Sequence, residues 1–289
     1  METKQVKQVG VVGAGTMGIG VSHAFAERGI PVLLMDISEE ILDRAQREIK
    51  RNHFTYRMFG QAKGQPQADP DELMSRIDLT VDLERFANVD YVVENATEDW
   101  AVKEPIYRQL DRICPPHTVF GVNTSAISVT RLGGVTSRPA QVIGTHFMNP
   151  VPLKPVVEVI RGYHTSTETI ERTRELFTAI GKDSIVVEDS PGFVTNRVMM
   201  LTVNEAAFLL YEDVASAKDI DRLFVDCFGH KMGPLETCDL IGLDTVLLSL
   251  EVLYDSFNDP KYRPCPLLKK LVHAGRLGRK SGQGFHSYV

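Results

Sequence analysis

The sequence has few cysteines, no excess of basic residues and no long apolar run. Its four cysteines, in 289 residues, form no Cys-x-x-Cys pair, so we expect reduced thiols and no metal site. A net charge of −6 provides no general basic face for a nucleic acid. The sequence also shows no secretory leader pattern and no membrane-length apolar stretch, so we expect a soluble cytoplasmic protein without a membrane partner.

Short apolar runs alternate with helical stretches from Gln8 to about Glu188. The runs are VGVVGA, PVLLMD, DYVVENA, TVFGVN, QVIGTH, VVEVI and SIVVED, and helical periodicity covers Glu39–Phe59 and Trp100–Ile113. Continuous apolar runs joined by helices indicate a mostly parallel sheet with crossover helices. We therefore predict an α/β fold, with a doubly wound Rossmann-type sheet over residues 1–188.

The pattern changes after the dipeptide Pro191-Gly192, which is a natural boundary. No strand-like run of any length follows. Apolar residues recur at helical spacing over Val194–Glu212, Asp219–Phe228, Leu243–Phe257 and Leu267–Ala274. We predict a smaller all-helical C-terminal domain over residues 189–289.

The first apolar run leads into a glycine motif, Gly13-x-Gly15-x-x-Gly18, followed by a helix. These glycines permit a tight turn, close approach of a pyrophosphate and close helix–strand packing. Asp36 ends the next run, where a carboxylate accepts ribose hydroxyls and repels a 2′-phosphate, so NAD is favoured over NADP. The alternative is a glycine-rich turn with an aspartate that caps a helix.

A bound nicotinamide needs a partner that moves a proton, and histidine is the usual one. His146 ends the run QVIGTH, at the carboxyl edge of the sheet where ligands bind. Glu158 interrupts the apolar run VVEVI and needs a partner to offset its desolvation. From spacing alone, a His146–Glu158 pair and a purely structural Glu158 remain equally open.

Five segments together resemble the 3-hydroxyacyl-CoA dehydrogenase family, which includes 3-hydroxybutyryl-CoA dehydrogenases. The segments are GAGTMG, NTSAIS, GTHFMNPVPLKPVVEVI, DSPGFVTNR and GRKSGQGFHSY, and they occur in family order along the whole chain. The resemblance implies NAD-dependent oxidation of an (S)-3-hydroxyacyl thioester to the 3-oxoacyl thioester, or the reverse. It also implies a homodimer formed through the helical domain.

The resemblance assigns roles to particular residues. His146 would be the base for the 3-hydroxyl proton and Glu158 would orient it, while Ser125 and Asn196 would bind the reacting oxygen or the thioester region. The alternative for Ser125 and Asn196 is that each caps a helix. The alternative for Lys103 and Lys280, which are among the cofactor contacts that the resemblance implies, is that they are solvated. The implied cofactor contacts are Gly13, Gly15, Met17, Gly18, Asp36, Glu98, Lys103, Asn149 and Lys280.

The sequence departs from the family where CoA is held. Without a gap, Asn52 takes the place of a usual serine, and a small gap would bring Lys63 to the place of a usual lysine. Because this part of the sequence has fewer lysines than is usual in the family, it offers fewer cations to bind the phosphates of CoA. The acyl group could therefore be carried on CoA or on an acyl carrier protein, as in family members that act on glyceryl-type intermediates of polyketide biosynthesis.

Two other classes remain as alternatives. One is a β-hydroxyacid dehydrogenase of the same fold, which would use a catalytic lysine. The other is a non-catalytic dinucleotide-binding member of the family, against which Ser125, His146, Glu158 and Asn196 argue because all four are present.

Overall fold

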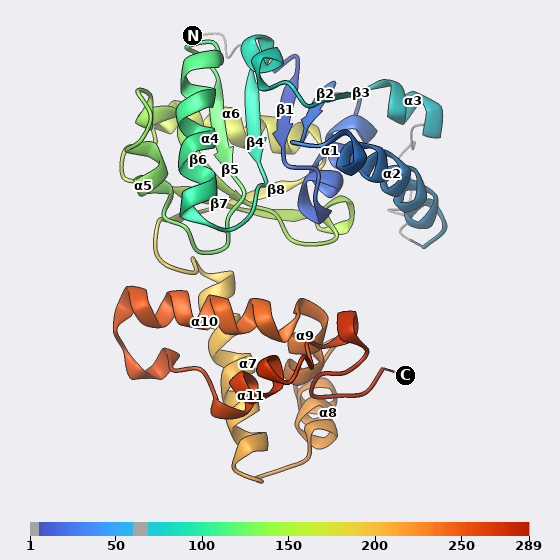
Figure 1. Ribbon diagram of the computed structural model, residues 1–289, viewed down its shortest axis with the longest axis vertical. Coiled ribbons are helices and arrows are strands. Elements are labelled where there is room, and N and C mark those ends of the chain that lie inside the picture. The colour runs from blue at the N-terminus through green and yellow to red at the C-terminus, as the bar shows by residue number, and fades with distance from the viewer. Residues whose placement is uncertain (1–5, 60–68, 289) are drawn as a thin grey trace. The chain divides into compact units, whose positions relative to one another are not determined.

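The chain folds into two compact units, Met1–Asp189 and Ser190–Val289. The structure is a computed structural model, and it describes residues 6–59 and 69–288. Each unit has a hydrophobic core of its own, so each is described by itself. Figure 1 shows strands in the first unit and helices alone labelled in the second.

One eight-stranded sheet forms the centre of the first unit (Figure 1). Its spatial order is β3-β2-β1-β4-β5-β6-β7-β8, and all neighbours pair in parallel except β6 and β7. The strands are β1 Val9–Val12, β2 Val32–Met35, β3 Ile77–Thr80, β4 Tyr91–Glu94, β5 Val119–Val122, β6 Val142–His146, β7 Val156–Arg161 and β8 Asp183–Glu188. The predicted α/β, Rossmann-type sheet is confirmed.

All seven apolar runs of the sequence became strands, whereas β3 was missed. Strands β1, β4 and β5 are buried along their whole length, as continuous apolar runs predict. Strand β3 lies at the edge of the sheet and carries the exposed Asp78, so its four residues give no continuous apolar signal.

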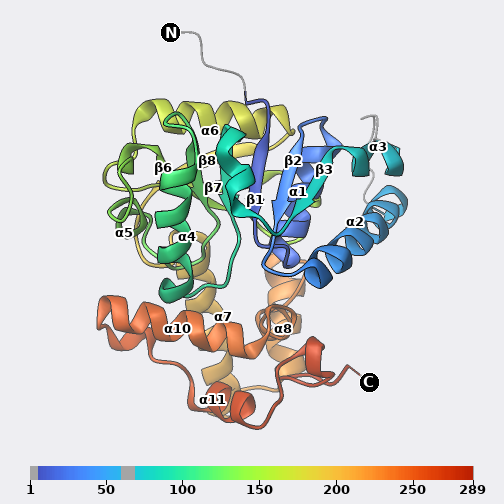
Figure 2. The same cartoon turned by 45° about the horizontal axis from the view of Figure 1, so that its top comes forward.

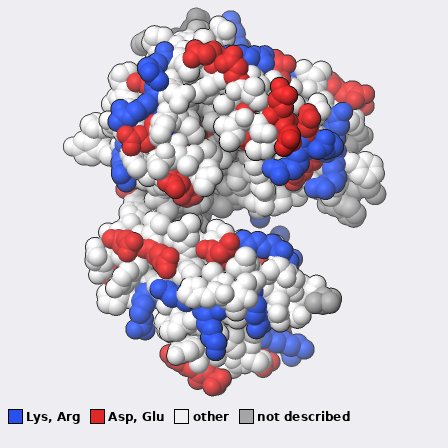
Figure 3. All heavy atoms as spheres, in the orientation of Figure 1, with Lys and Arg blue, Asp and Glu red and all other residues white. Residues whose placement is uncertain are grey.

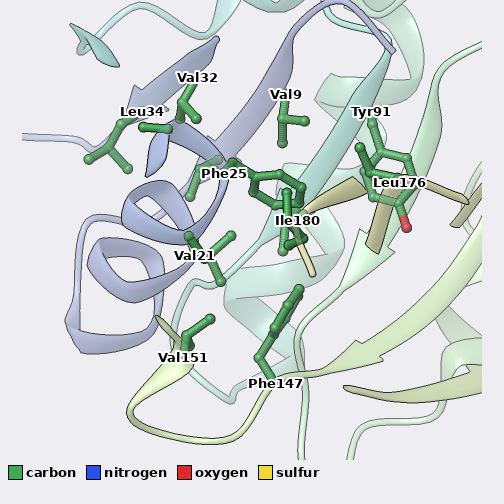
Figure 4. Close-up of a cluster of buried hydrophobic side chains, with 14 of the residues drawn as sticks. Val9, Val21, Phe25, Val32, Leu34, Tyr91, Phe147, Val151, Leu176 and Ile180 are labelled. Atoms are coloured by element: carbon green, nitrogen blue, oxygen red, sulfur yellow. The ribbon is translucent and has the colours of Figure 1, made fainter. Parts of the chain in front are cut away.

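Helices cover both faces of the sheet. The helices of the first unit are α1 Thr16–Glu27, α2 Glu39–Phe59, α3 Pro70–Ser75, α4 Trp100–Ile113, α5 Val129–Gly133 and α6 Thr167–Ala179. One face packs against α1 and α6, and Figure 4 shows Phe25 of α1 close to Val9 of the sheet. On the other face, Tyr107 of α4 meets Phe120 of β5 edge-on, with ring centres 6.1 Å apart. Helices α1 and α2 lie side by side in Figures 1 and 2.

The second unit consists of helices around a core of its own. They are α7 Thr195–Tyr211, α8 Ala217–Phe228, α9 Pro234–Ile241, α10 Leu243–Phe257 and α11 Pro266–His273. Four of them were expected within two residues of these bounds, and α9 was missed because proline opens a segment of only eight residues. The buried carboxylate of Asp239 secures the C-terminal segment by accepting bonds from the Phe285 and His286 amides and the Tyr288 hydroxyl.

None of the helices in residues 6–59 and 69–288 is both long enough and apolar enough to cross a membrane.

Candidate active site

The turn between β1 and α1 is shaped by two glycines that leave no room for a side chain. A Cβ atom on Gly18 would lie 1.8 Å from the Gly13 carbonyl oxygen, so α1 can approach the end of β1 only at a glycine. Gly13 has a φ of 92°, in the left-handed region that L residues avoid. A Cβ atom on Gly15 would meet no described atom within 4 Å, so this side of the turn is open.

Two further features suit this turn to a dinucleotide. Gly15 caps α1 without a side-chain bond to the first-turn amides, so the positive end of the helix can attract an anion. Asp36 follows β2 directly and accepts hydrogen bonds from the amides of Ala14 (2.7 Å) and Ile37 (2.7 Å). Its carboxylate is thereby fixed beside the turn, where it can accept ribose hydroxyls and repel a 2′-phosphate. These residues fit the ADP half of NAD.

Ser125, His146 and Glu158 form a chain of hydrogen bonds at the end of β6. The antiparallel register of β6 and β7 places His146 directly opposite Glu158. His146 Nδ1 lies 2.9 Å from Glu158 Oε2, and His146 Nε2 lies 3.1 Å from the Ser125 hydroxyl. His146 and Glu158 are each 5% exposed. The structure thus brings together three of the four predicted catalytic residues.

This arrangement gives the two ring nitrogens of His146 different tasks. An ionised carboxylate can only accept, so Nδ1 carries the proton that faces Glu158, and Nε2 of a neutral ring offers its lone pair toward Ser125. If Nε2 takes a proton, Glu158 offsets the new positive charge in a place that water barely reaches. The cluster can therefore accept a proton from a hydroxyl group near Nε2 and return it.

Two asparagines tie together the ends of the strands around His146. Asn123, directly after β5, accepts a hydrogen bond from the Phe147 amide (3.2 Å) and donates to Asn95 Oδ1 (2.7 Å). Asn95 follows β4. The ends of β4, β5 and β6 are therefore linked by side chains, which fixes the position of His146.

Glu98 holds the loop that carries Ser125. Its Oε1 atom accepts hydrogen bonds from the amides of Ser125 (2.8 Å) and Ala126 (2.9 Å), and from the Thr124 hydroxyl. This carboxylate therefore keeps the Ser125 hydroxyl near His146. A contact of Glu98 with the nicotinamide side of the cofactor stays a prediction.

Comparison with known proteins matches both parts of the chain. Residues 8–190 match the NAD binding domain of 3-hydroxyacyl-CoA dehydrogenase, and residues 192–288 match its C-terminal domain. The chain belongs to the 3-hydroxyacyl-CoA dehydrogenase family. It is an NAD-dependent oxidoreductase, as the glycine turn and Asp36 predicted.

Relatives of this family member match over nearly their whole length. The probable 3-hydroxybutyryl-CoA dehydrogenase of Bacillus subtilis is 42% identical over 284 residues, which cover 98% of each chain. The 3-hydroxybutyryl-CoA dehydrogenase of Bradyrhizobium diazoefficiens is 42% identical over 98% of this chain and 96% of its own. The crystal structure of (S)-3-hydroxybutyryl-CoA dehydrogenase from Ralstonia eutropha superposes with a TM-score of 0.91 at 40% identity, covering 99% and 100% of the two chains.

Lys103, predicted as a cofactor contact, is fully buried in the dehydrogenase and paired with Glu94. Its Nζ lies 2.8 Å from each carboxylate oxygen of Glu94, and both side chains have 0% exposure. Burial raises the pKa of Glu94, and the Lys103 ammonium opposes that rise. Glu94 was missed in the sequence, although a carboxylate within the apolar run DYVVENA is the same signal that singled out Glu158. Whether Lys103 also contacts NAD stays a prediction.

The other predicted residues lie in α1, after β6 and in the second unit. Asn149 is exposed in the segment after β6, and Met17 is half-buried in the first turn of α1. Asn196 is half-buried at the start of α7, and Lys280 is ion-paired with Asp244 at 2.6 Å. Their contacts with substrate or cofactor stay predictions.

The two predicted thioester contacts lie in or after α2. Asn52 is half-buried on this helix. Lys63 lies outside the described residues, so its prediction is neither supported nor opposed.

Proposed function

We propose that this dehydrogenase interconverts an (S)-3-hydroxyacyl thioester and the 3-oxoacyl thioester, with a short acyl chain on CoA. The observation that carries the proposal is His146, hydrogen-bonded to both Ser125 and Glu158 at the carboxyl end of β6. Relatives named for 3-hydroxybutyryl-CoA make this thioester the first substrate to test.

The side chains account for the proton that moves in the reaction. During oxidation His146 Nε2 takes the proton of the 3-hydroxyl group, and Glu158 stabilises the imidazolium that forms. The Ser125 hydroxyl donates a hydrogen bond to the same oxygen as it becomes a carbonyl. NAD, when bound, supplies the acceptor for the hydride that leaves C3. During reduction His146 returns its proton to the oxygen. We further propose that Asn196 binds the thioester region.

The acyl group has two candidate carriers, CoA and an acyl carrier protein. Helix α2 presents the exposed cations Arg44, Arg47, Lys50 and Arg51, and Figure 3 shows basic side chains beside acidic ones on this side of the first unit. Cations of this kind suit the CoA phosphates and also the acidic surface of a carrier protein. CoA is the first choice because it is the thioester named in the family. The carrier protein is the second candidate because Asn52 replaces the usual serine and the sequence after it has fewer lysines than is usual in the family.

A parallel assay distinguishes the two candidate carriers. NADH consumption is measured with acetoacetyl-CoA and with acetoacetyl-carrier protein. We expect rapid turnover of the CoA thioester. Turnover of the carrier-bound thioester alone would replace CoA with the carrier protein. Equal kcat/KM values on both would remove the reason for invoking a carrier protein.

We also propose a cytoplasmic homodimer that associates through the second unit. Exposed apolar side chains on this unit support the contact, among them Leu223, Phe228 and Leu248, and the four free thiols suit a reducing compartment. A particle with the mass of one chain in light scattering would contradict the dimer, and recovery in an oxidising compartment after cell fractionation would contradict the location.

A further inference from the structure

Helices α1 and α2 bring two histidines and one glutamate together, outside the cluster around His146. His23 and Glu27 are four residues apart on α1 and so lie on the same face of this helix. His53 reaches them from α2, the helix beside α1 in Figures 1 and 2. Figure 4 shows that Val21 and Phe25 of α1 belong to the hydrophobic core, so the cluster uses another face of the helix.

Three potential ligand atoms of this cluster converge. The Glu27 Oε2 atom lies 3.2 Å from His53 Nδ1 and 3.7 Å from His23 Nε2, and the two nitrogens are 3.4 Å apart. A point about 0.7 Å above the plane of these three atoms, where a tetrahedral ion would sit, is about 2.1 Å from each of them, which is within the range of Zn–N and Zn–O bonds in proteins. Neighbouring ligands of a tetrahedral zinc ion are about 3.4 Å apart at that bond length. The observed triangle is close to one face of such a tetrahedron.

The surroundings of the three ligand atoms suit a bound cation. The 3.4 Å between the two ring nitrogens exceeds the usual 2.7–3.2 Å of an N–H hydrogen bond. His23 is 3% exposed and His53 2%, so the two ring nitrogens lie where water barely reaches. The Glu27 side chain is 17% exposed, so the cluster lies close to the surface of the first unit. Tyr56 stacks on the ring of His23 and restrains it.

We propose that His23, Glu27 and His53 bind one divalent transition-metal ion, for which Zn²⁺ is the first probe. Two imidazole nitrogens and one carboxylate oxygen form a donor set that zinc accepts, with water as the fourth ligand. The ion would join α1, which follows the dinucleotide turn, to α2, which carries Asn52 next to His53. Its role is to hold the two helices together, apart from the hydride transfer itself. The cysteine pattern of the sequence predicted no metal site, and two histidines that are thirty residues apart give no ligand signal of their own.

The test uses the full-length protein after treatment with a chelator. Titration calorimetry should show one Zn²⁺ per chain, with a Kd on the order of 1 μM or tighter. At 100 times the Kd, zinc should raise the Tm of the first unit by about 5–10 °C. Co²⁺ at the same site should give the visible absorption bands of a four-coordinate ion.

Four substitutions locate the ion. Glu27→Gln and His53→Gln should each weaken zinc binding by at least about 10²-fold and abolish the rise in Tm, since each removes one of three protein ligands. The matched control is His117→Gln, which removes a histidine paired with one carboxylate, Asp90, at 3.1 Å, and should leave zinc binding unchanged. His146→Gln should also leave it unchanged, because the cluster around His146 is a separate one.

Three results would overturn the proposal. The first is wild-type protein that binds no zinc, which would reduce the cluster to histidines sharing a proton with Glu27. The second is unchanged zinc binding in both Glu27→Gln and His53→Gln. The third is loss of zinc binding in His146→Gln alone, which would place the ion at the candidate active site. Circular dichroism of each variant, and its NADH binding, show whether the first unit remains folded.

Discussion

The variant His146→Gln is expected to have a kcat lower by about 10²–10⁴-fold, the usual contribution of a general base. The reason is that Nε2 of His146, held between Ser125 and Glu158, is the atom that we propose takes the substrate proton. Glutamine has no nitrogen that can accept a proton near neutral pH, but its amide offers a donor to Glu158. The NADH affinity should change little, since the glycine turn and Asp36 are untouched.

NADH consumption gives kcat, and energy transfer from Trp100 to NADH gives the affinity, because Trp100 is the only tryptophan of the chain. His117→Gln again serves as the control, and its kcat should remain within about twofold of the wild type. If His146→Gln retained more than about one-tenth of the wild-type kcat, the base would have to be another group. If the wild-type protein bound NADH and turned over neither thioester, the non-catalytic alternative would hold.

The variant Lys103→Met should lower the free energy of unfolding of the first unit by about 3–5 kcal/mol. The substitution leaves the Glu94 carboxylate without its ammonium partner at a position with 0% exposure. Loss of one partner is costly because the remaining charge stays buried and unpaired. Urea unfolding followed by the fluorescence of Trp100, which lies at the start of α4 in the same unit, measures the change.

Two comparisons distinguish this effect from a general sensitivity of α4. The double variant Lys103→Met/Glu94→Gln removes both charges and should recover most of the lost stability. Arg108→Ala breaks an exposed ion pair with Glu104 on the same helix and should cost less than about 1 kcal/mol. A Lys103→Met variant as stable as Arg108→Ala would show that the buried pair contributes little.

Much of the fold could be predicted because most strands of the sheet are buried. Seven strands have continuous apolar sequences, whereas β3 carries Asp78 at the edge of the sheet and gives no such signal. The pairing of His146 with Glu158 could only be suggested. Spacing along the chain does not show that β7 runs antiparallel to β6, and this direction is what places the two residues opposite each other.

Two other groups of residues, one at Lys103 and one at His23 and His53, depend on contacts that spacing along the chain does not reveal. Lys103 was predicted as a cofactor contact, with a solvated lysine as the alternative, and only the packing of α4 shows that it is buried against Glu94. His23 and His53 are thirty residues apart and give no joint signal in the sequence. Their proximity arises from the packing of α1 on α2, which brings together residues that are far apart in the sequence.

The most direct test of the proposed reaction is the transfer of deuterium from the nicotinamide C4 of labelled NADH to acetoacetyl-CoA by the unmodified protein. We expect one deuterium at C3 of the product, (S)-3-hydroxybutyryl-CoA. Acetoacetyl-carrier protein is run in parallel. If NADH is bound and neither product acquires deuterium at C3, the chain does not transfer hydride to a 3-oxoacyl thioester, and the central claim is wrong.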